Sequence, residues 1–68
     1  RKLSFKEQKE LEQIERDLAS WSEERKQLEE ELSSGTLPYD RLTKCSERIE
    51  ELIALIDEKE MRWLELNE

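Results

Sequence analysis

Two long stretches of the chain carry apolar residues at alternating spacings of three and four. In the first stretch the pattern falls on Leu11, Ile14, Leu18, Trp21, Arg25, Leu28 and Leu32. In the second it falls on Leu42, Cys45, Ile49, Leu52, Ile56, Lys59, Trp63 and Leu66. This spacing is the a/d heptad repeat of a coiled coil, so each stretch predicts an amphipathic α-helix. The single basic residue in each stripe can cover an opposing leucine with its stem while its charge reaches water.

Signals at the ends of these stretches set the helix boundaries. Ser4 followed by Glu7 matches a capping box, in which each side chain satisfies an unpaired backbone N–H of the other residue. Gly35 suits the left-handed conformation that ends many helices, and Pro38 follows shortly after it. We therefore predict one domain over 1–68, with a helix over about 5–34, a turn over 35–38 and a helix over about 39–66.

Charges beside the stripes decide how the two helices pair. The g positions of the first helix are all acidic: Glu10, Asp17, Glu24 and Glu31. Those of the second are Arg41, Arg48, Leu55 and Arg62. Antiparallel pairing sets g against g, so acids meet arginines, whereas a parallel dimer of the first helix would set acids against neutral or acidic residues. The predicted fold class is all-α, a two-helix antiparallel coiled-coil hairpin within a monomeric chain.

Composition narrows the function classes. With no His and only one cysteine in 68 residues, neither a disulfide framework nor a zinc site is available. The 46% of charged residues and the lack of an apolar run of about 20 residues argue against a membrane span. Because the chain begins at Arg1 rather than Met, we expect a piece of a longer cytoplasmic protein.

The sequence contains no recognisable catalytic motif. The sequence has no Gly-rich phosphate loop, no metal-ligand cluster and no nucleophile with a histidine. Cys45, Trp21 and Trp63 all lie on the apolar stripes, where packing is the simpler interpretation. We expect a domain that is not itself an enzyme and holds no metal or cofactor.

Three surface features are candidates for binding a partner rather than ordinary solvent-exposed side chains. A basic stripe lies on the outer face of the first helix, at c and f positions, and consists of Lys2, Lys6, Lys9 and Arg16. A tip cluster near the turn consists of Lys26, Arg41, Lys44 and Arg48. Both are candidate nucleic-acid contacts, although Arg41 and Arg48 have Glu24 and Glu31 as partners. The third feature is a possible docking patch at Ile53 and Leu55, which flank the core of the second helix and could equally broaden it.

The two ends of the chain carry a resemblance. Residues 1–12 read RKLSFKEQKELE, and residues 60–66 read EMRWLEL. They resemble the KLS(Y/F)KEQRELE opening and the ERWLELE closing motif of the C-terminal domain of ABC-F ATPases of the Uup-like group. The resemblance implies a parent with two ATP-binding cassettes, which use ATP and magnesium, and no membrane segment. Its ATP-site motifs are absent here, so no catalytic residue carries over. Members act on ribosomes or in DNA-linked processes, and this hairpin is associated in them with DNA binding.

Two functions follow as hypotheses. In the first, the domain is a module that contacts DNA or ribosomal RNA weakly and helps to place the parent. The net charge of −7 requires such a contact to be local and oriented. In the second, it is a protein-interaction arm that docks on the parent's cassettes or on a second copy. The first depends on the basic stripe and the second on Ile53 and Leu55.

Overall fold

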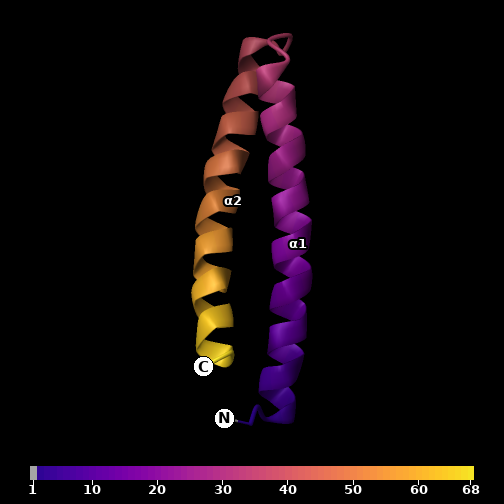
Figure 1. Cartoon of the computed structure of the whole chain (residues 1–68). Helices are drawn as coiled ribbons and strands as arrows, with labels where there is room; N and C mark the ends of the chain where they lie inside the picture. Colours follow the sequence, from indigo (N-terminus) through magenta and orange to yellow (C-terminus); the bar gives the residue numbers. More distant parts are fainter. Residues whose placement is uncertain (1) are drawn as a thin grey trace.

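The chain folds into two long helices that run in opposite directions beside each other. A computed structural model describes residues 2–68. Helix α1 spans Phe5–Ser33 and α2 spans Tyr39–Leu66, and both termini lie at the same end, opposite the connecting turn (Figure 1). The molecule measures 50 × 15 × 14 Å. The predicted fold class, an all-α antiparallel hairpin, is confirmed.

The predicted capping box begins α1. The backbone N–H of Glu7 donates to Ser4 Oγ at 3.1 Å, and the backbone N–H of Ser4 donates to Glu7 Oε1 at 3.1 Å. Two backbone donors that the first helical turn leaves unpaired are thereby satisfied. The capping box fixes the start of α1 at Phe5, so Lys2 lies outside the helix.

The turn depends on Gly35. Ser34 N–H still donates to the carbonyls of Glu30 and Glu31, at 3.1 and 3.2 Å, and Gly35 N–H donates to Leu32 at 3.4 Å. Gly35 then takes a φ of +70°, in the left-handed region that other L-residues rarely adopt. Pro38 stands immediately before α2, with an extended backbone. Five residues, 34–38, thus reverse the chain.

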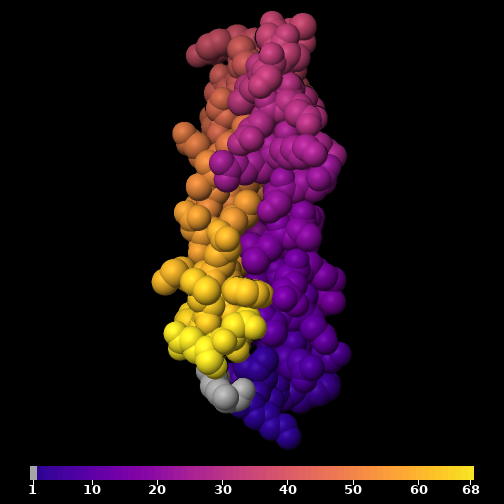
Figure 2. All heavy atoms as spheres, viewed as in Figure 1, coloured from indigo at the N-terminus to yellow at the C-terminus, as the bar shows by residue number. Residues whose placement is uncertain are grey.

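The core is one line of side chains between the helices. Its fully buried members lie on the predicted a/d stripes, and they are Ile14, Cys45, Leu52 and Leu66. Most other stripe residues are half-buried, because a two-helix structure covers each side chain from one direction only. Side chains of the two helices fill the space between the ribbons along their length (Figure 2).

Residues in and beside the stripe follow the predicted heptad phase. Arg25 is half-buried and turns its guanidinium outward, where Nε donates to Glu29 Oε1 at 2.8 Å. Met61, at an outer f position, is 65% exposed. Leu42 is the exception within the stripe, at 37% exposed. Its antiparallel partner position falls at Gly35, which has no side chain to cover it.

The heptad phase is tested by two substitutions close together in α2. Trp63→Ala should lower the free energy of unfolding by about 2 kcal/mol, because Trp63 is half-buried and a fully buried aromatic costs roughly 3–5 kcal/mol. Met61→Ala should change it by less than about 0.5 kcal/mol. Urea unfolding followed by circular dichroism measures both. Equal losses at the two positions would place the core on a different face of α2.

Candidate functional site

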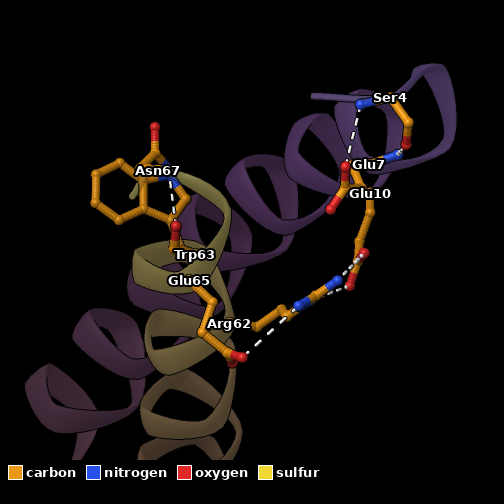
Figure 3. A network of polar contacts seen from close by, with 7 residues as sticks. All are labelled: Ser4, Glu7, Glu10, Arg62, Trp63, Glu65 and Asn67. Carbon is orange, nitrogen blue, oxygen red and sulfur yellow. Dashed lines mark hydrogen bonds and ion pairs between the residues drawn. The ribbon is translucent and has the colours of Figure 1, made fainter. Parts of the chain in front are cut away.

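One edge of the hairpin is closed by carboxylate–guanidinium pairs between the helices. Arg62 Nε and Nη2 donate to the two carboxylate oxygens of Glu10 at 2.8 and 2.9 Å (Figure 3). Arg48 Nε and Nη2 bind Glu24 in the same way, at 2.6 and 3.0 Å. Such two-pronged pairs fix geometry as well as charge. The predicted g–g pairing is therefore present, with the acids on α1 and the arginines on α2.

The turn end of this edge is held more loosely, and its middle has no pair. Arg41 Nη2 lies 3.6 Å from Glu31 Oε2. The remaining acidic g position, Asp17, is paired by the antiparallel register with Leu55 rather than with an arginine. Its carboxylate instead accepts a hydrogen bond from Gln13 Nε2 at 2.9 Å. The edge thus consists of three ion pairs and one apolar gap.

These pairs shift the titration of their members. The hydrogen bonds from Arg62 hold the pKa of Glu10 below its ordinary value of 4.5, and those from Arg48 do the same for the pKa of Glu24. The pKa values of Arg48 and Arg62 are raised by the same hydrogen bonds. Arg48 also binds Glu51, and Arg62 lies 3.7 Å from Glu65. Arg48 and Arg62 therefore stabilise the hairpin, and their charges are already paired with glutamates.

The basic stripe lies on the outer face of α1, and Lys6 stands close enough to this edge that its charge also lowers the pKa of Glu10. Lys6 and Arg16 are exposed, and Arg16 Nη2 donates to Gln13 Oε1 at 3.0 Å. Lys9 lies 3.5 Å from Glu12 with its side chain 62% exposed. Lys2 is exposed too, but it precedes the capping residue Ser4, so the helical period does not set its position. Three of the four predicted contacts share one helical face.

Phe5 adds an aromatic group to the stripe that the sequence analysis did not single out. It is 77% exposed, and Lys9 Nζ lies 5.4 Å from the centre of its ring. The signal was available in the sequence, because Phe5 stands at a b position, outside the a/d stripe. An exposed ring beside lysines can stack on a nucleic-acid base.

The tip cluster divides into two kinds of residue. Arg41 and Arg48 bind Glu31 and Glu24. Lys26 and Lys44 are exposed, and within residues 2–68 no ion pair holds them. The tip therefore offers two free cations rather than four.

Ile53 and Leu55 lie on opposite sides of the core stripe of α2, and their role in docking stays a prediction. Both are half-buried, and two positions along an α-helix differ by about 200° around its axis. Leu55 belongs to the edge with the ion pairs, whereas Ile53 belongs to the opposite edge. Each edge therefore has to be considered separately as a docking surface.

Groups that could support metal or thiol chemistry are few in the described part of the chain. No cluster of three or more metal-ligating side chains occurs among residues 2–68. Cys45 is buried, and burial followed by its hydrogen bond to Glu31 raises the pKa of the thiol. Over the same residues, neither helix is long and apolar enough to cross a membrane.

Comparison with known protein families agrees with this geometry. The model of the ABC transporter C-terminal domain matches residues 2–68, almost the whole chain. The chain belongs to the ABC transporter C-terminal domain family. This domain is found in ABC-F proteins such as Uup, so the chain is the C-terminal domain of an ABC-F type ATPase. The resemblance of its two ends is thereby confirmed. Searches of curated proteins and of solved structures find no significant match.

The closed edge of this ABC-F domain predicts a specific dependence on pH. Because the pKa values of Glu10 and Glu24 are lowered in the folded state, both carboxylates stabilise the hairpin above their unfolded pKa. That contribution is lost as the pH falls through the lower, folded pKa. Glu10→Gln/Glu24→Gln should therefore destabilise the domain at pH 7, and its difference from wild type should shrink as the pH falls and vanish below the folded pKa of the two carboxylates.

A second variant with the same change in charge separates this effect from general repulsion among the acids. Glu47→Gln/Glu50→Gln removes two exposed carboxylates that bind no arginine in the described residues. It should leave stability at pH 7 unchanged or slightly higher. Thermal unfolding between pH 2 and 8 measures all three proteins. A difference between wild type and Glu10→Gln/Glu24→Gln that does not vary with pH would contradict the role given to these pairs.

Proposed function

We propose that this ABC-F C-terminal domain contacts nucleic acid, DNA or ribosomal RNA, through the basic stripe on α1 and so helps to place its parent ATPase. The observation that carries the proposal is that some basic residues are paired between the helices, while others are exposed on the outer face of α1. The interhelical arginines neutralise acids of α1, whereas Lys6, Lys9 and Arg16 are exposed on an outer face of α1 that α2 does not cover. Lys2 is exposed just before the helix begins. Phosphate groups are the ligands that such a face suits.

Local charge supports this surface despite the net charge of −7. Residues 1–16 contain five basic and four acidic side chains, while residues 17–68 contain seven basic and fifteen acidic ones. Of the four acids, Glu10 is held by Arg62, Glu7 by the backbone of Ser4, and Glu12 lies near Lys9. Residues 1–16 thus carry a net charge of +1 in a molecule of net charge −7, and the positive end of the α1 dipole lies there.

The spacing of the stripe suits a short stretch of phosphate backbone. Lys6 and Arg16 are ten residues apart, which is about 15 Å along a helix. Contacts to phosphates position a protein without reading sequence. With at most four contacts and acidic surroundings, we expect a dissociation constant at or above the range of about 10⁻⁴–10⁻⁶ M typical of non-specific binding. Binding of this strength adds to that of a larger parent, whose cassettes would turn over ATP in the cytoplasm.

Reversing the stripe tests the proposal. Lys6→Glu/Lys9→Glu/Arg16→Glu should abolish binding to duplex DNA and structured RNA at low salt without unfolding the hairpin, because none of the three residues is buried. For the wild type, the slope of log K against log salt should be about −0.9 per contact on duplex and about −0.7 on single strands. Fluorescence anisotropy of labelled oligonucleotides measures both quantities.

Two doubly substituted variants with equal charge provide the control. Lys6→Glu/Lys9→Glu changes the stripe, and Lys26→Glu/Lys44→Glu makes the same change in charge at the tip. Only the first should weaken binding strongly. Arg48→Glu should cost stability more than binding, because Glu24 and Glu51 are its partners. No detectable binding by the wild type, or equal losses from the two double variants, would overturn the proposal.

A further inference from the structure

The two edges of the hairpin are built differently. On the edge opposite the ion pairs, the described residues make no ion pair between helices. The polar contact that crosses there is a hydrogen bond from Trp63 Nε1 to Glu15 Oε2, at 3.2 Å. This bond holds one side of the indole ring at the surface between the helices. The edge is thus less tightly closed than the edge of Glu10 and Arg62.

A groove lies beside this indole. Its volume is about 310 Å³, and it is lined by Leu18, Glu60, Trp63 and Leu64. Leu64 is 55% exposed, a large value for a leucine next to a half-buried tryptophan. The volume is at the lower limit of small-molecule sites, which usually enclose most of their ligand. Four lining residues on the two antiparallel helices instead suit an anchoring side chain from a larger partner.

Two carboxylates stand at this groove: Glu60 from α2 lines it, and Glu15 from α1 accepts the hydrogen bond of the indole that lines it. Within residues 2–68 neither forms an ion pair. Helices bring side chains together at spacings of three and four, and no basic residue stands at those spacings from either carboxylate. No basic neighbour on the same helix can therefore neutralise them by a change of rotamer. An apolar floor with two uncompensated negative charges selects an apolar ligand that carries positive charge.

We propose that this groove binds a basic amphipathic helix of a protein partner, with an apolar side chain on Trp63 and Leu64 and basic side chains near Glu15 and Glu60. Helix-in-groove recognition uses such an arrangement of anchors and flanking charges. A second copy of the domain does not fit face to face, because a symmetric contact would oppose the same carboxylates. Nucleic acid is repelled by them. The surface continues toward the turn through Ile53, which lies on this edge, two turns of α2 before Glu60.

The experiment uses designed peptides of about four helical turns as probes. A Leu/Lys peptide with leucines at helical spacing should bind the wild-type domain, whereas a Leu/Glu peptide of the same pattern and a Ser/Lys peptide should not. Leu64→Gln should weaken binding of the Leu/Lys peptide about tenfold, as loss of an apolar contact does. Met61→Gln is the matched control, since Met61 is also an exposed apolar residue, three residues away and not part of the groove. It should leave binding unchanged.

Charge is tested separately. Glu15→Gln/Glu60→Gln should weaken binding and make it less dependent on salt, whereas Glu47→Gln/Glu50→Gln, near the turn, should do neither. Circular dichroism confirms that each variant is folded. Absence of Leu/Lys binding, equal effects of Leu64→Gln and Met61→Gln, or equal binding of the Leu/Glu peptide would each overturn the proposal. These outcomes do not depend on nucleic-acid binding, because the basic stripe is unchanged in all variants.

Discussion

Each helix of this domain has a single neighbour, and this constraint governs the rest of the structure. A helix with one neighbour can bury one stripe of side chains, so the core is a line that includes Ile14 and Leu52. A line of apolar contacts alone does not define the direction in which the helices pair. That information comes from the edge beside the line, where Glu10 and Glu24 bind Arg62 and Arg48. Tethering by a short turn then makes the pairing intramolecular.

The same constraint leaves most of the surface available for partners. Because the arginines between the helices are paired on one edge, the exposed cations are those of the basic stripe at the open end and, near the turn, Lys26 and Lys44. On the other edge, Glu15 and Glu60 stand without cations beside an apolar groove. The domain thus presents a basic face and an acidic, partly apolar edge that can act at the same time. A parent ABC-F ATPase could hold a nucleic acid with one and a protein segment with the other.

The fold was predictable because its determinants are local in sequence. The a/d stripes, the capping pair Ser4 and Glu7 and the acidic and basic g positions each predict one feature, and all agree. The surfaces were less predictable. The g positions in the sequence already indicated acidic partners for Arg41 and Arg48, but the strength of each pair depends on side-chain rotamers: Arg48 binds Glu24 through two hydrogen bonds, whereas Arg41 lies 3.6 Å from Glu31. The sequence did not reveal the groove at Leu64, because the heptad pattern marks b positions only as outside the core. Ile53 and Leu55 are close in the sequence, but the helical period places them on opposite edges of the hairpin.

The antiparallel pairing within one chain is tested most directly by distances between spin labels. With Cys45→Ala to remove the native thiol, labels are placed at the exposed positions Gln8 and Asn67, and in a second sample at Gln8 and Lys44. Labelled chains are diluted into unlabelled ones, so that only distances within a chain are seen. The account predicts a short distance for Gln8 and Asn67 and about 30–40 Å for Gln8 and Lys44. A Gln8–Asn67 distance approaching the roughly 90 Å of one continuous helix would contradict it.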